Sequence, residues 1–127
     1  MAARKSIYIP SFQHENPIPN AARVGYLLMS GLIAGVDPET RLLPDDLDQQ
    51  LTNLFSYVKD IVEASGGTTD NILKINVWLK DPGNRELLNK HWLSMFPDEN
   101  TRPARHTQPL QGESRALVTC DIVAVFN

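Results

Sequence analysis

Apolar residues recur at helical spacing in two segments of the chain. The members of the first stripe, which fall at steps of one, three or four residues, are Leu47, Leu51, Leu54, Phe55, Val58, Ile61 and Val62. Asp45 or Asp46 can cap the start of this helix, and Gly66-Gly67 can end it. The members of a second, shorter stripe are Leu87, Leu88, His91, Trp92, Met95 and Phe96, and Pro97 closes it. The pattern predicts two amphipathic helices.

Four other segments have the character of β-strands. They are Ser6–Pro10, Gly25–Gly31, Asn71–Lys80 and Ala116–Phe126. Alternation in the third segment places Leu73, Ile75, Val77 and Leu79 on one face. The last segment is apolar on both faces and needs cover on both. Two helices cover only one face of a sheet, so we expect another subunit on the other.

The order of these elements is β-β-α-β-α-β, which predicts an α+β two-layer sandwich with both helices on one sheet face. The 127 residues suit a single domain, residues 1–127. No apolar run approaches the roughly 20 residues that span a bilayer, and the first residues lack the apolar segment of a signal peptide. We therefore expect a cytoplasmic protein.

The net charge of the chain makes nucleic acid an unfavourable partner. Lys and Arg total 12 against 15 Asp and Glu, so the net charge is −3. A mildly acidic chain lacks the broad basic face that nucleic acid requires.

The single cysteine excludes an internal disulfide. Cys120, in the middle of the last strand, is expected to be a small buried apolar residue. Asp121 beside it needs a partner, and Lys74 or an arginine of a neighbouring subunit would serve.

Polar residues gather in two loop-like stretches, His14-Glu15-Asn16 and Arg102–Thr107. Pro103 stiffens the backbone beside Arg105, and a guanidinium held in this way suits bidentate capture of a small carboxylate. The alternative is an ordinary surface arginine in a turn. The three histidines form no metal-binding signature, so no metal site is predicted. His91 is expected to pack at the edge of the core, while His14 and His106 are candidates for proton transfer.

Several short motifs occur in order along nearly the whole chain. They are Asn16-Pro17 followed by Ala21 and Gly25, Leu27–Gly31 with its Ser-Gly end, Asp37-Pro38-Glu39-Thr40, Gln49–Gly66, Ile72–Asp81, Asn89 with Phe96, and Arg102-Pro103-Ala104-Arg105. Together these stretches resemble the Rid family, also called YjgF-type or endoribonuclease L-PSP proteins. Arg102-Pro103-Ala104-Arg105 resembles the family's Pro-Ala-Arg-Ser/Thr signature.

The resemblance implies a chorismate-mutase-like fold and a homotrimer, in which three sheets form a central barrel and ligand sites lie between subunits. It also implies a hydrolytic deaminase of a small enamine or imine, such as 2-aminoacrylate, that releases ammonia and a 2-oxo acid. No metal or organic cofactor is implied. The family's carboxylate-binding arginine corresponds to Arg105. Further substrate contacts correspond to Ser30, Gly31, Asn89 and Thr107.

The chain departs from the family at three positions. The family's cleft tyrosine falls on Ile18, the glutamine after Ser-Gly on Leu32, and the water-positioning glutamate on Thr119. Water addition needs a group that orients water and protonates the leaving amine. We hypothesise that His14 or Glu15 supplies it, with Glu113 as a weaker candidate. Two other functions stay open: a non-catalytic trimer that binds a small acid, and, least favoured, a ribonuclease.

Overall fold

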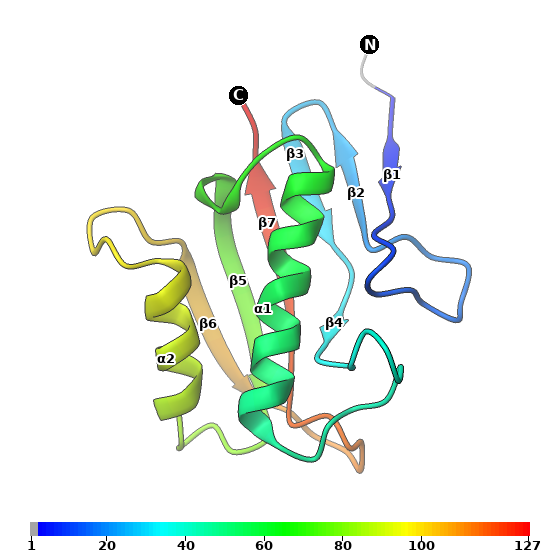
Figure 1. Ribbon diagram of the computed structural model, residues 1–127. Coiled ribbons are helices and arrows are strands. Elements are labelled where there is room, and N and C mark those ends of the chain that lie inside the picture. Colours follow the sequence, from blue (N-terminus) through cyan, green and yellow to red (C-terminus); the bar gives the residue numbers. More distant parts are fainter. Residues whose placement is uncertain (1–2) are drawn as a thin grey trace.

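The computed structural model describes residues 3–127 and shows two helices packed against one face of a mixed sheet (Figure 1). The elements are β1 (Lys5–Ile7), β2 (Ala21–Val24), β3 (Leu27–Ser30), β4 (Ile33–Ala34), α1 (Leu47–Ala64), η1 (Thr69–Asn71), β5 (Ile72–Leu79), α2 (Glu86–Met95), β6 (Ala104–Pro109) and β7 (Val118–Val125). The strand order is β1-β2-β3-β7-β5-β6, and β4 also pairs with β7. Only β5 and β6 run parallel to each other. The predicted α+β class with two helices on one mixed sheet is confirmed.

Both helices lie close to their predicted ranges because their apolar stripes face the sheet. Asp46 caps α1, since its carboxylate accepts from the Gln49 N–H at 3.1 Å. Asp45, the other predicted cap, instead forms an ion pair with Arg115. Gly66 follows the helix with a φ of +90°, a conformation that glycine adopts without a steric penalty. Sequence periodicity was therefore sufficient to find α1 and α2.

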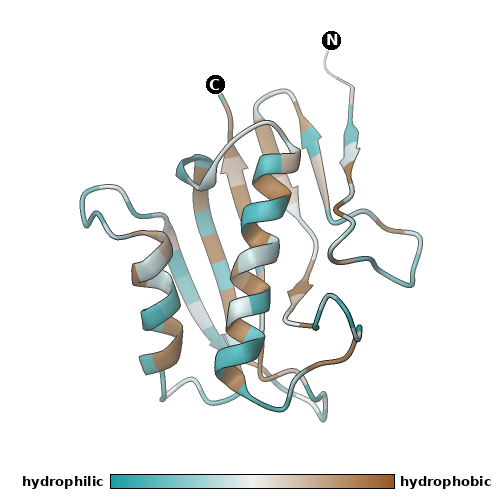
Figure 2. Ribbon diagram, viewed as in Figure 1, coloured by the Kyte–Doolittle hydropathy of each residue, from teal (hydrophilic) through white to brown (hydrophobic). Residues whose placement is uncertain are grey.

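The hydrophobic core lies between the helices and the sheet. Alternation along β5, visible as bands of opposite hydropathy in Figure 2, directs Ile75 and Val77 into this core. Cys120 on β7 faces the same layer and is fully buried, which confirms the expectation for this residue. Burial raises the pKa of its thiol, so Cys120 is an inert core residue.

Three strands were not predicted, and Leu73 does not lie on the face of β5 predicted for it. Strands β2, β4 and β6 are short or polar, and β6 (sequence ARHTQP) falls within the stretch interpreted as a loop. Leu73 is 59% exposed and does not join the buried face of β5. A register irregularity between Ile72 and Lys74 shifts the alternation at this point.

The sheet face opposite the helices is not covered within one chain. Asp121 lies on this face and accepts a hydrogen bond from the Asn76 side-chain amide at 2.8 Å. The expectation that Lys74 pairs with Asp121 is wrong, because Lys74 stands opposite Val123, two register pairs further along the strands. Apolar side chains are also exposed here, with Met29 at 56% and Leu27 at 48%. This face combines apolar side chains with a satisfied polar pair.

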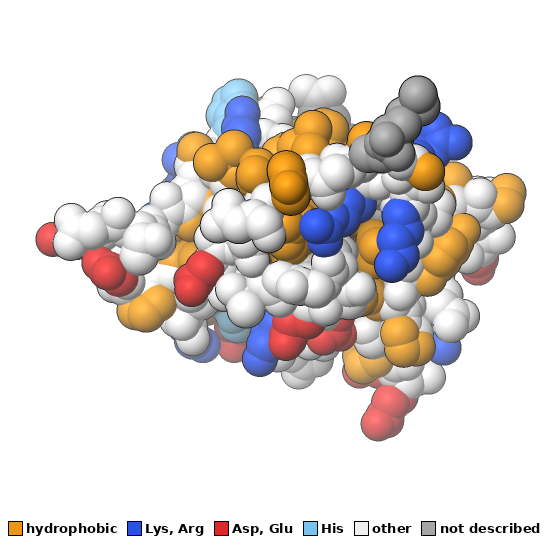
Figure 3. Space-filling model, turned by 90° about the horizontal axis from the view of Figure 1, so that it is seen from above, with side chains coloured by type: hydrophobic (Ala, Val, Ile, Leu, Met, Phe, Trp, Pro, Cys, Tyr) orange, Lys and Arg blue, Asp and Glu red, His pale blue; other side chains and the backbone are white. Residues whose placement is uncertain are grey.

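The surface mixes charge types. Seen from the end where both termini lie, Lys and Arg side chains are interspersed with apolar and acidic ones (Figure 3). Neither helix of the part of the chain that the structure describes is long and apolar enough to cross a membrane.

Candidate functional site

Arg105 lies on the edge strand β6 with its side chain directed toward α2. Its register partner on β5 is the core residue Ile75, which sets the orientation toward the helix layer. The Nη2 group donates to the Asn89 Oδ1 at 2.9 Å. The guanidinium carbon lies 4.9 Å from the centre of the Trp92 ring, within range of a cation–π contact. Two residues of α2 thus orient the guanidinium.

One nitrogen of this guanidinium has no partner. Nη1 of Arg105 is buried and makes no hydrogen bond within residues 3–127. Burial lowers the pKa of Arg105, and the positive charge of Arg85 lowers it further. The guanidinium still keeps its charge. A buried charged donor without an acceptor is costly, and a carboxylate is the anion whose geometry matches it. Arg105 is therefore the candidate residue for binding a small carboxylate.

Thr107 and His106 lie on different faces of the sheet. Thr107 pairs with the core residue Val77 and points to the helix side, as Arg105 does. His106 pairs with Asn76 and points to the open face. Thr107 therefore lies close to Arg105, as expected from the sequence, while the proton-transfer candidate His106 does not share its face.

Ser30 and Gly31 lie at the end of β3, away from Arg105. The Ser30 hydroxyl accepts from the Ile122 N–H at 2.9 Å and donates to the Gly31 carbonyl at 2.8 Å. Strands β7 and β5 lie between β3 and β6. Three strand spacings amount to about 14 Å. A single chain therefore does not bring Ser30 and Arg105 around one small metabolite.

His14, Glu15 and Ile18 belong to the segment between β1 and β2, which borders two cavities. The first, of about 420 Å³, is lined by Tyr8, Ile9, Pro10, Gln13, His14, Asn16, Pro17, Ile18 and Asn20. The second, of about 400 Å³, is lined by Ser11, Phe12, Gln13, His14, Glu15, Asn16, Val36 and Arg41. His14 thus lies beside the position of the missing tyrosine, and Glu15 lines a different cavity. The His14 Nε2 is buried and unpartnered within the described residues.

Thr119, which the family resemblance aligns with a glutamate, lies on the open sheet face. It is 4% exposed, and its Oγ1 makes no hydrogen bond within residues 3–127. Thr119 pairs with Trp78 across β5. Glu113, the weaker acid/base candidate, is exposed in the loop before β7.

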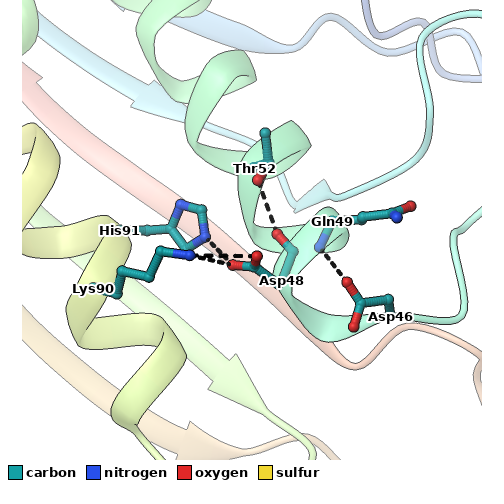
Figure 4. Close-up of polar contacts among 6 residues, drawn as sticks. All are labelled: Asp46, Asp48, Gln49, Thr52, Lys90 and His91. Carbon is teal, nitrogen blue, oxygen red and sulfur yellow. Dashed lines mark hydrogen bonds and ion pairs between the residues drawn. The ribbon is translucent and has the colours of Figure 1, made fainter.

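His91 joins the two helices on the side away from Arg105. Its Nε2 lies 2.7 Å from the Asp48 carboxylate, and its ring stacks on Phe55 at 5.9 Å between centroids (Figure 4). Lys90 approaches the same carboxylate at 3.4 Å. The hydrogen bond to His91 is the main cause of the lowered pKa of Asp48. The prediction of a packed histidine at the core edge is confirmed.

Two residues at this site were missed or misjudged from the sequence. Trp92 was counted only as a core residue, yet its ring also holds Arg105. Arg85 was not considered at all. The spacing Arg85, Asn89, Trp92 is i, i+4, i+7, and it could have identified one helix face carrying all three. Within residues 3–127, no group of three or more His, Cys, Asp and Glu side chains could hold a metal ion.

The sequence matches the family described as Endoribonuclease L-PSP over residues 12–125. A RutC family protein of Aquifex aeolicus is 34% identical over 115 residues, which cover 86% of this chain and 88% of that protein. A 2-iminobutanoate/2-iminopropanoate deaminase of Salmonella typhimurium is 30% identical over 90 residues, 70% of each chain.

Solved structures share the same fold. The crystal structure of the YjgF gene product of E. coli superimposes with a TM-score of 0.86 at 25% identity, covering 97% of this chain and 99% of that one. RidA from the Antarctic bacterium Psychrobacter gives a TM-score of 0.86 at 23% identity, covering 96% and 99%. Similarity therefore extends over almost the whole length of both proteins.

Proposed function

Because this chain belongs to the endoribonuclease L-PSP family, also called the Rid family, we propose that it is a hydrolytic deaminase of a small carboxylate-bearing enamine or imine. The observation that carries this proposal is the Arg105 guanidinium, oriented by Asn89 and Trp92 with a buried Nη1 left without an acceptor. The deaminase of Salmonella supports the same reaction class.

The reaction balances without a cofactor. The enamine first takes a proton at carbon and gives up one from nitrogen, which yields the imine. Water then adds to the imine carbon, the C–N bond breaks, and ammonia leaves with the proton it needs, which yields the 2-oxo acid. Arg105 holds the carboxylate next to the reacting carbon. Such positioning converts part of the binding energy into orientation of the reacting groups.

We place the site between neighbouring subunits of a trimer. Arg105 with Asn89 and Thr107 forms one side, and Ser30 with Gly31 lies about 14 Å away in the same chain. Docking the open sheet face against a second copy would bury Met29 and Leu27 and supply the missing side. Burial of the apolar sheet face and completion of the site thus both favour the proposed trimer.

His14 is the favoured acid/base residue of the proposed reaction. It lies beside Ile18, where the family has its tyrosine, and its Nε2 has no partner within the described residues. Histidine exchanges protons near neutral pH. Glu15 lines the neighbouring cavity, and Glu113 is exposed, so both are weaker alternatives.

A second candidate function is binding of a small acid without turnover. The observation that favours it is Thr119, whose buried hydroxyl replaces a carboxylate and lacks a partner within residues 3–127. Ile18 likewise replaces a proton-transferring tyrosine. In this case the carboxylate is captured, but water is not activated.

One experiment separates these functions. An amino-acid oxidase generates the imine in situ, semicarbazide traps it, and hydrolysis by the protein lowers the yield of semicarbazone. We expect the wild-type protein to lower the yield of semicarbazone. Arg105→Ala should hydrolyse the imine at least about 100-fold more slowly, because a bidentate charged contact with the carboxylate is removed. Arg105→Lys keeps the charge but loses the planar fork, so we expect only partial recovery.

Arg4→Ala removes an equal charge from an exposed position and serves as the control. An equal loss of hydrolysis in Arg4→Ala would mean that the assay responds to the overall charge of the protein and not to the site. Saturable, Arg105-dependent binding of the 2-oxo acid with no change in semicarbazone would replace the deaminase by the binding function.

A further inference from the structure

One face of α2 carries a second arginine in line with the site. The Asn89 N–H donates to the Arg85 carbonyl at 2.8 Å in the first i to i−4 hydrogen bond of α2, so Arg85 is the N-cap residue one turn before Asn89. Arg85, Asn89 and Trp92 are therefore spaced i, i+4, i+7 and share one face. Asn89 and Trp92 both contact the Arg105 guanidinium, which establishes that this face is turned toward β6.

The direction of the chain places Arg85 one turn beyond Asn89 on the side of α2 that faces β6. Strands β5 and β6 are parallel, so the intervening α2 runs in the opposite direction to β6 (Figure 1). Moving from Asn89 to Arg85, about 6 Å along the helix, corresponds to moving from Arg105 toward Thr107, about 6.6 Å along the strand. Thr107 of β6 and Arg85 of α2 thus lie at about the same level, one step beyond Arg105 and Asn89.

Neither arginine is neutralised within residues 3–127. The ion pairs of that part of the chain involve Asp48 and Asp45, and neither carboxylate pairs with Arg85 or Arg105. The Arg85 Nε donates to the Pro82 carbonyl at 2.8 Å, which orients the guanidinium, and its two terminal nitrogens make no hydrogen bond to any of residues 3–127. The repulsion between the two charges contributes to the lowered pKa of Arg105. A ligand with two negative charges would relieve this repulsion.

We infer that Arg85 forms a second anion subsite and that the preferred substrate is the imine of a dicarboxylic amino acid, with its two carboxylates separated by two or three carbons. This inference rests on the proposed function. Arg105 holds the carboxylate next to the reacting carbon, and Arg85 holds the distal one, at the level of the Thr107 hydroxyl. The corresponding product is a dicarboxylic 2-oxo acid.

The test compares two product-like acids of equal chain length, 2-oxoglutarate and 2-oxopentanoate, which differ in the distal carboxylate. Calorimetry on the full-length protein measures both dissociation constants. We expect 2-oxoglutarate to bind about tenfold tighter, the effect of one exposed charge-assisted contact. Arg85→Gln should reduce this ratio to about one. Lys90→Gln removes the same charge from the same helix on the side that faces Asp48, and should leave the ratio unchanged.

The outcomes separate the subsite from the proposed function. If both acids bind equally and Arg105→Ala abolishes both, the second subsite is wrong and carboxylate capture stands. A ratio that survives Arg85→Gln also overturns the subsite. Binding of neither acid, or binding that persists in Arg105→Ala, overturns carboxylate capture and the subsite with it.

Discussion

At the scale of single residues, the clearest feature is one buried polar side chain whose hydrogen bonds link two parts of the fold. Gln50 is fully buried in α1, and its side chain satisfies three backbone groups. The amide donates to the carbonyls of Pro44 and Arg115 at 2.7 and 3.3 Å and accepts from the Leu117 N–H at 2.9 Å. This one side chain ties the approach to β7 to the first turn of α1.

The backbone of Gln50 sets a strict requirement on Gly35. A Cβ at position 35 would lie 2.1 Å from the Gln50 carbonyl oxygen. Backbone cannot move aside as a flexible side chain can, so Gly35→Ala should lower the free energy of unfolding by about 3 kcal/mol or more. Chemical denaturation measures this change.

Gly83→Ala is the matched control for this prediction. Its new Cβ would make an ordinary contact of 3.7 Å with the Asp81 side chain, and we expect a change within about 0.5 kcal/mol. Equal stability of the two variants would contradict the close packing of Gly35 on α1.

The sequence predicted the motif residues of the proposed site better than the charged residues around them. Arg105 and Asn89 were both named from the family motif, and the structure joins them by a hydrogen bond of 2.9 Å. Arg85 escaped notice because its relevance comes from the helix face it shares with Asn89. Motifs preserve the residues that contact a ligand, whereas a neighbouring charge becomes visible only when the helix is placed against its strand.

At the scale of elements, α2 is the platform of the site and needs an anchor. The helix has ten residues and no side-chain cap at its N-terminus. Short helices depend on tertiary contacts for stability. The His91–Asp48 hydrogen bond supplies such a contact with α1 (Figure 4). It therefore also steadies Asn89 and Trp92, which hold Arg105.

This anchor should make stability depend on pH in the acid range. The hydrogen bond from His91 lowers the pKa of Asp48 below its ordinary value of 3.8. A carboxylate whose pKa is depressed on folding stabilises the protein above its unfolded pKa and loses that effect as the pH falls through the folded one. Wild type should therefore exceed Asp48→Asn in stability at pH 6, and the gap should close as the pH falls below 3.8 and through the lowered pKa of Asp48.

Two further variants identify the cause. His91→Gln removes the main contributor and should remove most of the pH-dependent gap, whereas Lys90→Gln removes a contact of 3.4 Å and should retain most of it. Denaturation midpoints between pH 6 and pH 2.5 provide the measurement. A gap unaffected by His91→Gln would show that the carboxylate acts on the helix terminus of α1 instead.

At the scale of the whole molecule, the proposed site is divided between the two edges of the sheet. Arg105 lies on the edge strand β6, and His14 precedes β2 near the opposite edge. In the proposed trimer, in which open sheet faces meet, we expect the β6 edge of one chain to lie beside the segment before β2 of the next. A complete site would then take Arg105 from one chain and His14 from the next.

Subunit mixing tests this division. Arg105→Ala and His14→Ala should each be inactive, and refolding them together in equal amounts should restore about a quarter of the sites, since half of the chains at each side of an interface are intact. The semicarbazone assay measures the recovery. No recovery from two well-folded variants would contradict a shared site, and activity of His14→Ala alone would remove His14 from the mechanism.

The sequence by itself determined the two helices, the main strands, the family and the arginine that carries the proposal. Apolar periodicity and short motifs are local properties, so they survive without any knowledge of the fold. Tertiary structure decided the polar strand β6, the Asp121–Asn76 pair, the exposed Leu73 and the alignment of Arg85 with Arg105. These features depend on which strands become neighbours and in what register, and long-range pairing of this kind leaves no trace in the local pattern of residues.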